Sequence, residues 1–235
     1  MIRRLQLDWP AGLPRGESEP KPLRLLAVSD EPDRGLSFER NRSEIGTLDA
    51  VIGCGDLEPD YLAFLGDAFC VPLLYVRGNH DRGVNWQETS TDLPAPLTGR
   101  REKLNGTSLI GLSWPGSEGG RDSRALRDDM AAWRQALRIG LRPRRNRPLI
   151  VVSHVPPLGL GDSPEDAYHR GFAAYQWLCH RLNPMLWLHG HTSLAAARGW
   201  RVQWGETTFA NVTGAVLVEI GMPADGPLPS AERGD

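Results

Sequence analysis

Val-Arg-Gly-Asn-His-Asp, residues 76–81, directly follows the apolar run Val71 to Tyr75. An extended apolar run that continues through a glycine into polar groups is typical of a buried strand that delivers ligands to one edge of a sheet. The same letters also suit an ordinary turn, because Gly-Asn is a favourable turn dipeptide. We interpret the stretch as half of a metal site, and this interpretation depends on what the other strand ends carry.

The length and composition of the chain favour one folded domain. With 235 residues, of which 40% are hydrophobic, the chain can bury a substantial core, and nothing divides it cleanly. We expect an N-terminal extension over residues 1–22, a domain over residues 23–220 and a flexible tail over residues 221–235. The net charge of -2 provides no general field that would attract nucleic acid.

The sequence shows no sign of export or membrane insertion. The first 22 residues lack the apolar core of a secretory signal, and no apolar run reaches the roughly 18 residues of a membrane span. We therefore predict a cytoplasmic protein. Cys54, Cys70 and Cys179 are far apart and lack Cys-x-x-Cys spacing, which predicts buried small hydrophobic residues rather than disulfides. The basic cluster Arg142 to Arg147 is expected to be a solvated loop.

Three apolar runs in the first third of the chain each lead into polar side chains. The runs cover residues 23–29, 49–54 and 71–76, and they lead into Asp30, Asp56 and Asn79. The connections over residues 36–48 and 58–68 are predicted to be helical, so that the strands are parallel neighbours. The carboxyl ends of parallel strands share one edge of the sheet, where ligands gather.

Two further apolar runs end at histidine. Leu149 to Ser153 stops at His154, and a short run from Met185 to Leu188 leads into His189-Gly190-His191. Another strand is predicted over residues 107–113. Residues 200–220 are interpreted as closing strands with a hairpin turn at Gly205-Glu206.

Two amphipathic helices are predicted in the second half of the chain. The first is capped by Asp122 or Ser123 and ended by Gly140, and one of its faces carries Leu126, Met130, Trp133 and Leu137. The second is marked by the 4-3-4-3 spacing of Tyr168, Phe172, Tyr175, Cys179 and Leu182. Asn183-Pro184 is expected to end it.

The polar blocks after these strands stand in a recognisable order. They are Asp30, Gly55-Asp56, Gly78 to Asp81, Ser153-His154 and Gly190-His191. This order resembles the calcineurin-like metallophosphoesterase family, whose blocks are Asp-x-His, Gly-Asp, Gly-Asn-His-(Asp/Glu), His and Gly-His-x-His. The resemblance covers roughly residues 23–220. It implies an α/β fold, a four-layer α/β/β/α sandwich of two sheets with helices outside.

The resemblance also implies hydrolysis of a phosphate ester at a pair of divalent metals. Two such ions about 3.5–4 Å apart clamp a phosphoryl group and lower the pKa of a bridging water, so that hydroxide is available near neutral pH. Imidazole nitrogens and an amide oxygen bind Mn, Fe or Zn without adding charge that would repel the substrate.

Each matching residue takes a role from the family. One metal would be held by Asp56, Asn79, His154 and His191. Asp30 would belong to the other metal, and Asp56 would bridge both ions. His80 would protonate the leaving oxygen, with Asp81 available to orient it.

Two histidines of the family pattern are missing from this chain. Asp30-Glu31-Pro32 stands where the family has Asp-x-His, and Gly190 to Ser193 ends in serine where the family has its last histidine. In the family both of these histidines serve the metal that Asp30 touches. The losses therefore leave one complete site and one depleted site.

Three hypotheses account for this pattern. The first is a hydrolase with one tight and one weak metal. The second is a rebuilt site, in which Glu31, Asp33 or His169 replaces the lost ligands. A bacterial branch of the family has Ser-Asp-Glu and a later His-x-Gly-Phe, as Ser29 to Glu31 and His169 to Phe172 have here, although a solvent-exposed histidine at a helix entry is the alternative. The third is a binding module, as in the retromer subunit that resembles phosphoesterases.

We favour catalysis, because a binding surface has no use for the retained ligand cluster or for His80. The expected substrate is a small phosphate ester, with a diester preferred slightly over a monoester because nothing in the sequence marks a pocket for a dianion. Variable loops over residues 82–102 and 114–123 would build the substrate pocket, so substrate, metal identity and oligomeric state stay open. His180 and His189 are interpreted as structural, and the tryptophans expected on or beside core faces are Trp133, Trp177 and Trp187.

Overall fold

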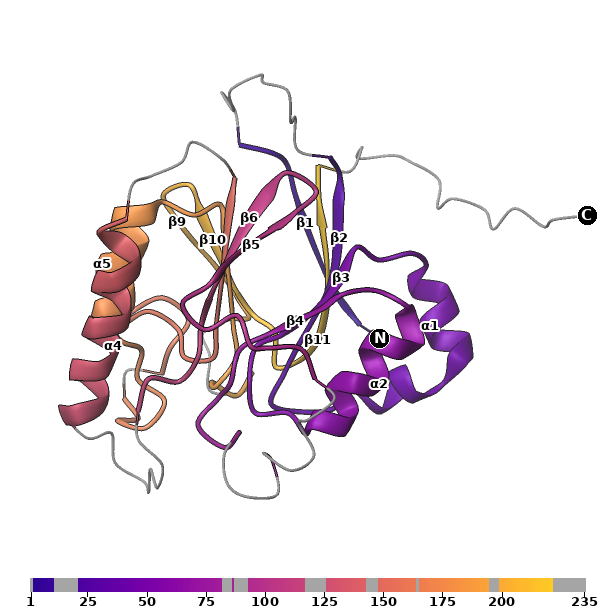
Figure 1. The fold of residues 1–235 in the computed structure, drawn as a ribbon, viewed down its shortest axis with the longest axis horizontal. Coiled ribbons are helices and arrows are strands. Elements are labelled where there is room, and N and C mark those ends of the chain that lie inside the picture. The colour runs from indigo at the N-terminus through magenta and orange to yellow at the C-terminus, as the bar shows by residue number, and fades with distance from the viewer. Residues whose placement is uncertain are drawn as a thin grey trace, which may run out of the picture.

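Figure 1 shows the computed structural model of the chain, which describes residues 2–10, 21–81, 86, 93–116, 126–142, 148–163, 165–194 and 199–221. Within these residues the strands form two sheets. The first has the order β1 (Arg3–Leu7), β11 (Gly214–Ile220), β2 (Leu23–Ser29), β3 (Ala50–Gly53) and β4 (Leu73–Tyr75). The second has the order β5 (Arg101–Leu104), β6 (Thr107–Leu112), β7 (Leu149–Ser153), β8 (Leu186–His189), β10 (Thr207–Asn211) and β9 (Arg201–Trp204).

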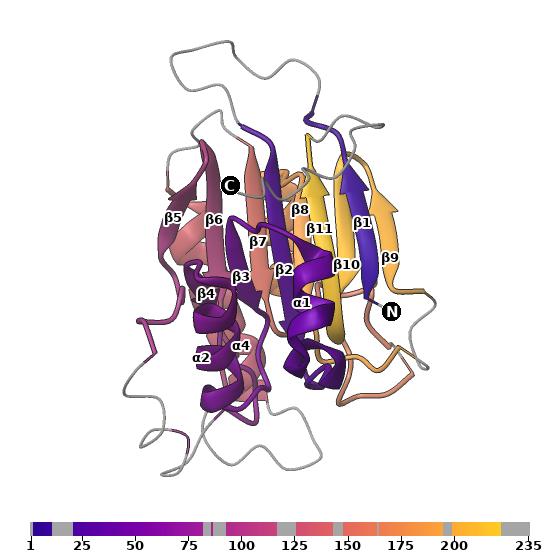
Figure 2. The ribbon, with the colours of Figure 1, turned by 90° about the vertical axis from the view of Figure 1, so that its right-hand side faces the viewer.

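Helices cover the outer faces of both sheets (Figure 1, Figure 2). On the first sheet lie the 3-10 helix η1 (Arg34–Ser37), α1 (Glu39–Ile45) and α2 (Pro59–Phe69). On the second sheet lie α4 (Leu126–Gly140) and α5 (Ala173–Leu182).

Three buried apolar clusters separate the four layers. The middle cluster joins the two sheets and contains Ile52 from β3 and Ile150 from β7. The outer clusters join each sheet to its helices, through Leu62 of α2 on one side and Leu178 of α5 on the other. The expected α/β/β/α sandwich is therefore confirmed.

The centre of each sheet is parallel, as the sequence predicts. In the first sheet β2, β3 and β4 run parallel to one another, and in the second sheet β6, β7 and β8 do the same. Parallel neighbours need crossover connections, and α2 supplies the one between β3 and β4. The polar blocks that follow these strands consequently collect at the carboxyl edges of both sheets.

Residues 3–7, which the sequence prediction places in an N-terminal extension, form edge strand β1. This strand pairs in parallel with β11. Leu5 is 1% exposed and belongs to the middle apolar cluster. The prolines that suggest an extension begin only at Pro10, after the strand has ended. The first sheet therefore starts before the predicted domain boundary at residue 23.

The four apolar side chains predicted to line one face of α4 are exposed, whereas Ile139 is buried. The exposed fractions of Leu126, Met130, Trp133 and Leu137 are 77%, 50%, 38% and 39%. The buried face of the helix is instead built largely from small residues, including Ala132 and Ala136. Small side chains allow the helix backbone to lie close to the layer beneath it.

α5 begins later than the spacing predicts. The 4-3-4-3 pattern places Tyr168 on the helix, but the helix starts at Ala173 and Tyr168 lies in the preceding loop. Phe172 has extended backbone and forms an isolated bridge with Pro157, which prevents an earlier start. The prediction that Tyr168 lies on an amphipathic helix is wrong.

The cysteines are free, with Cys54 and Cys179 buried as expected and Cys70 exposed. None of the helices that the structure describes is long and apolar enough to cross a membrane. Several predicted features lie outside the described residues, namely the caps Asp122 and Ser123, residues 82–85 and 87–92 of the loop predicted over residues 82–102, residues 117–123 of the loop predicted over residues 114–123, residues 143–147 of the basic cluster and the tail after Gly221.

Candidate metal centre

Five strand ends meet at one end of the sandwich. In chain order they present Asp30 after β2, Asp56 after β3, Asn79 after β4, His154 after β7 and His191 after β8. Asp30, Asp56 and His191 have φ angles of 60°, 55° and 67°, a left-handed backbone that residues other than glycine rarely adopt. Backbone strain of this kind is concentrated at functional sites.

Two glycines allow neighbouring strand ends to approach closely. A Cβ atom at Gly78 would clash with Oδ1 of Asp56. A Cβ atom at Gly190 would clash with Oγ of Ser29 and with Oδ2 of Asp30. Because glycine has no side chain, each of these positions leaves room for a carboxylate from an adjacent strand end.

Four side chains converge on one point. The ligand atoms of Asp56, His154 and His191 all lie within 4.8 Å of one another. Nε2 of His154 is 3.1 Å from Oδ2 of Asp56 and 3.2 Å from Nδ1 of His191. The same nitrogen is 2.9 Å from Oδ1 of Asn79. The structure thus brings together the four residues that the sequence assigns to one metal.

Each histidine of this group is oriented by a backbone carbonyl on its far side. Nδ1 of His154 donates to the carbonyl oxygen of Cys54 at 2.9 Å, which leaves Nε2 directed at the other ligands. Nε2 of His191 donates to the carbonyl oxygen of Tyr168 at 3.0 Å, which leaves Nδ1 directed inward. A carbonyl can only accept, so these bonds fix which nitrogen carries hydrogen. Such outer contacts are the usual support of metal-binding histidines.

The two oxygen ligands are oriented in the same way. Oδ1 of Asp56 accepts the backbone N–H of His80 at 2.8 Å, which leaves Oδ2 facing His154. The amide nitrogen of Asn79 donates to the hydroxyl of Tyr168 at 2.5 Å, which leaves Oδ1 facing His154. All four residues therefore direct one candidate ligand atom inward, and this mixed nitrogen and oxygen set fits Mn, Fe or Zn.

The electrostatics of the group correspond to a site for a cation. Burial opposes a charge on His154, but the Asp56 carboxylate outweighs it and raises the pKa of His154 to about 9. Burial likewise opposes ionisation of Asp56, but His154 lowers the pKa of Asp56 to about 2. Burial and the neighbouring charge of His154 lower the pKa of His191 to about 3. The proton on Nε2 of His154 thus supplies one positive charge among three acceptor atoms, which belong to Asp56, Asn79 and His191.

Comparison with known proteins identifies the family. The model of the calcineurin-like phosphoesterase family matches residues 26–193, more than half of the chain. The chain belongs to the calcineurin-like phosphoesterase family. No match is found among curated proteins.

Solved structures share the fold of this chain. The crystal structure of TT1561 of Thermus thermophilus is 14% identical, with a TM-score of 0.51, and the match covers 83% of this chain and 90% of that one. GAP50, described as the anchor in the inner membrane complex of Plasmodium, is 12% identical, with a TM-score of 0.50, and the match covers 82% of this chain and 71% of that one. At such low identity the likeness concerns the fold alone.

Asp30 stands beside the four-residue group rather than in it. Its Oδ2 accepts the backbone N–H of His191 at 3.0 Å and the hydroxyl of Thr213 at 3.2 Å. Among the described residues, the only set of three or more candidate ligand side chains excludes Asp30. Its negative charge nevertheless contributes to the raised pKa of His154. Asp30 therefore lies close to the centre, on the side from which the family pattern has lost two histidines.

His80 lies at the mouth of the site, and its side chain is 70% exposed. Its Nε2 is 4.0 Å from Oδ2 of Asp56 and 3.3 Å from the hydroxyl of Tyr168. This position next to the ligands, with access to solvent, suits a group that exchanges a proton with a bound substrate.

Asp81 does not contact His80 in the way expected from the sequence. Its carboxylate is buried and accepts three backbone N–H groups, from Asp56 at 2.8 Å, Leu57 at 3.1 Å and Gly78 at 2.7 Å. Burial raises the pKa of Asp81 to about 6, although the bond from Gly78 opposes the shift. Asp81 therefore ties together the two loops that carry Asp56 and Asn79.

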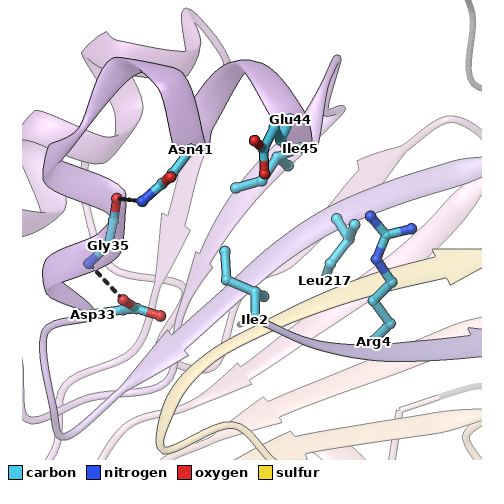
Figure 3. Close-up of a pocket in the computed structure, with 8 residues that line it drawn as sticks. All are labelled: Ile2, Arg4, Asp33, Gly35, Asn41, Glu44, Ile45 and Leu217. Atoms are coloured by element: carbon cyan, nitrogen blue, oxygen red, sulfur yellow. Dashed lines mark hydrogen bonds between the residues drawn. The ribbon is translucent and has the colours of Figure 1, made fainter.

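The three candidate replacements for the lost histidines lie in different places. His169 is beside the centre, with its ring centroid 5.2 Å from that of His191, and its Nδ1 contacts Asp166. Glu31 is exposed. Asp33 caps η1 by accepting the N–H of Gly35 and lines a separate cavity of about 220 Å³ (Figure 3). Among the three, only His169 is shown in contact with a residue of the four-ligand group.

Sequence reasoning missed one residue that the geometry brings to the centre. Tyr168 contacts Asn79, His80 and His191, although it stands far from them in the chain. Its helical spacing with later apolar residues made it look like part of a core face. The sequence signal for a loop was the nearby Gly171, because glycine inside a helical pattern weakens the expectation of a helix. In the structure a Cβ there would clash with the carbonyl of Pro157.

Proposed function

We propose that this protein is a metal-dependent phosphoesterase that hydrolyses a small phosphate ester, with a diester preferred slightly over a monoester. The observation that carries the proposal is the convergence of Asp56, Asn79, His154 and His191, each with one candidate ligand atom directed inward by an outer hydrogen bond. Outer hydrogen bonds that fix the orientation of every inward atom are the usual support of a metal site.

The four ligands would hold one divalent ion of the Mn, Fe or Zn class. Such an ion supplies a Lewis acid for the phosphoryl oxygens and a nucleophile at neutral pH. Asp56 directs Oδ2 at this position. In the family pattern the corresponding carboxylate is shared by both metals, so we assign the bridging role to Asp56. The second ion then keeps only Asp30 and the shared Asp56, so we expect it to bind weakly.

His80 would act as the general acid. Its exposed imidazole stands at the rim, 4.0 Å from the inward oxygen of Asp56, and can reach the leaving oxygen of a bound ester. Asp81 would act indirectly, by fixing the backbone on which Asp56 and His80 are carried.

The test is hydrolysis by purified protein that has been stripped of metal and then reloaded with Mn. Bis(p-nitrophenyl) phosphate serves as the diester and p-nitrophenyl phosphate as the monoester. Turnover should require Mn and should fall by a factor of about 10² to 10⁴ in His80→Ala. His180→Ala, at an exposed position on α5, is the matched histidine control and should retain activity.

A binding module is the second candidate, and the exposed apolar side chains of α4 favour it, because exposed apolar patches mark interaction sites. GAP50, which shares the fold, is described as an anchor. Absence of Mn-dependent turnover on both esters, together with unchanged folding of His80→Ala by circular dichroism, would decide for this alternative.

A further inference from the structure

Tyr168 touches the metal centre at three points. Its hydroxyl accepts a hydrogen bond from the amide nitrogen of Asn79 at 2.5 Å and lies 3.3 Å from Nε2 of His80. Its backbone carbonyl accepts a hydrogen bond from Nε2 of His191 at 3.0 Å. One residue of the loop before α5 therefore connects side chains that follow β4 and β8, which belong to different sheets.

The loop that carries Tyr168 is held in place from outside the centre. Asp162 is buried, and its two carboxylate oxygens accept the backbone N–H groups of Gly159 at 2.9 Å and Gly171 at 2.8 Å. The N–H of Ser163 donates to the carbonyl of His169. The loop that carries Tyr168 therefore has anchors of its own, in addition to the contacts of Tyr168 with the centre.

The hydroxyl of Tyr168 determines which end of the Asn79 amide faces the centre. An amide can present either its oxygen, which binds a cation, or its NH₂ group, which cannot. Because the NH₂ group donates to Tyr168, Oδ1 is directed at Nε2 of His154. Removing the hydroxyl would take away the acceptor that the Asn79 NH₂ group has in the described part of the chain.

The same hydroxyl meets the imidazole of His80. The side chain of His80 is 70% exposed, so few contacts restrict it. The contact with the Tyr168 hydroxyl keeps Nε2 of His80 directed toward Asp56, where a leaving oxygen would lie. The hydroxyl of Tyr168 therefore contacts both a candidate metal ligand, Asn79, and the expected general acid, His80.

We propose that Tyr168 is a positioning residue that orients Asn79 for metal binding and His80 for proton transfer. This inference rests on the proposed function and adds to it a residue that the family pattern does not contain. The ring of Tyr168 also packs at 5.3 Å from that of His191, so the hydroxyl and the ring have separable roles.

The experiment replaces Tyr168 by phenylalanine, which keeps the ring and removes the hydroxyl. Isothermal titration of the metal-free protein with Mn alone should show affinity lower by about 10- to 100-fold, the usual effect of losing an outer partner of a metal ligand. At saturating Mn, kcat for the more reactive of the two esters should also fall, with little change in KM. Tyr61→Phe is the matched control, because the Tyr61 hydroxyl accepts the N–H of Asp33 at 3.1 Å, outside the centre.

A double substitution separates orientation of Asn79 from a general structural effect. In an Asn79→Ala background, Tyr168→Phe has no amide to release, so its effect on Mn affinity should shrink to within about twofold. An equal loss of affinity with and without Asn79 would overturn the proposal, as would wild-type Mn affinity and kcat in Tyr168→Phe. If wild-type protein binds Mn but hydrolyses neither ester, the proposed function fails while the affinity series still decides the role of Tyr168 toward Asn79. If wild-type protein binds no Mn, both fail.

Discussion

Metal binding by this protein should release a proton, and the structure gives the stoichiometry. The pKa of His154 is raised to about 9 by Asp56, so about 99% of the metal-free protein carries this proton at pH 7. Nε2 of His154 cannot bind an ion until the proton leaves. Asp56 and His191, with pKa values lowered to about 2 and about 3, have already lost theirs. We therefore expect about one proton released for each ion bound at the four-ligand site.

The same argument fixes how affinity changes with pH. Below the pKa that His154 has in the folded protein, its imidazole holds a proton that competes with the metal ion. Mn affinity should therefore rise about tenfold per pH unit in this range. Between pH 6.5 and 8.5 this amounts to about 100-fold, or about 2.7 kcal/mol. The rise should level off as the pH passes the pKa of His154. Isothermal titration in Mes, Hepes and Tris, whose ionisation enthalpies differ, measures the proton count directly, and a titration series across the window measures the slope.

The result that would refute this reasoning is equally specific. Binding heats that do not depend on the buffer, or an affinity that stays flat from pH 6.5 to 8.5, would mean that His154 is not protonated in the metal-free centre. Replacing the exposed His180 by alanine should leave the proton count unchanged, because its ring lies on Trp204, away from the ligands.

Three further predictions test other parts of the site. Asp56→Asn should abolish Mn-dependent hydrolysis in the ester assay, and a variant with normal rate would remove the bridging role. Asp81→Ala leaves three backbone N–H groups without their acceptor and should lower the free energy of unfolding by about 3 kcal/mol or more in urea titration. As a control, Asp60→Ala at an exposed position should change the free energy of unfolding by no more than about 0.5 kcal/mol. Gly190→Ala should weaken Mn binding in calorimetry, since its Cβ would clash with Asp30 and force two strand ends apart; unchanged affinity would show that the ends can separate harmlessly.

The convergence of the four candidate ligands could be predicted from the sequence, because the residues that follow parallel strands are placed at one edge of the sheet. Apolar runs without alternation predict buried parallel strands, and the residues that follow such strands must share one edge of the sheet. Leu149 to Ser153, for example, forms a strand with the predicted bounds and delivers His154 to the ligand group. The family resemblance then supplied the pairing of distant blocks, which periodicity alone does not give.

The parts that escaped prediction depend on contacts between segments far apart in the chain. Asp81 stands next to His80 in sequence, yet its carboxylate turns to the backbone of Asp56 and Gly78, because buried N–H groups there need an acceptor. Tyr168 keeps helical spacing with core residues but lies in a loop. In both cases a local pattern suggested one partner, and the tertiary structure provided another.

The same limit applies to the outer layers. An apolar stripe on α4 predicts a helix face, but the pattern does not say which neighbour covers it, and here alanines face inward. Strand β1 escaped notice because five residues with one fully buried side chain give little periodic signal.

The division of the ligands between the sheets has a consequence for how the protein matures. Asp56 and Asn79 follow strands of one sheet, whereas His154 and His191 follow strands of the other. An ion in the centre would therefore bind residues of both sheets. At a free ion concentration 100 times the dissociation constant, binding would stabilise the native state by about 2.7 kcal/mol. Capture of the ion must await docking of both halves of the sandwich, so a newly made chain that holds metal has already completed its assembly.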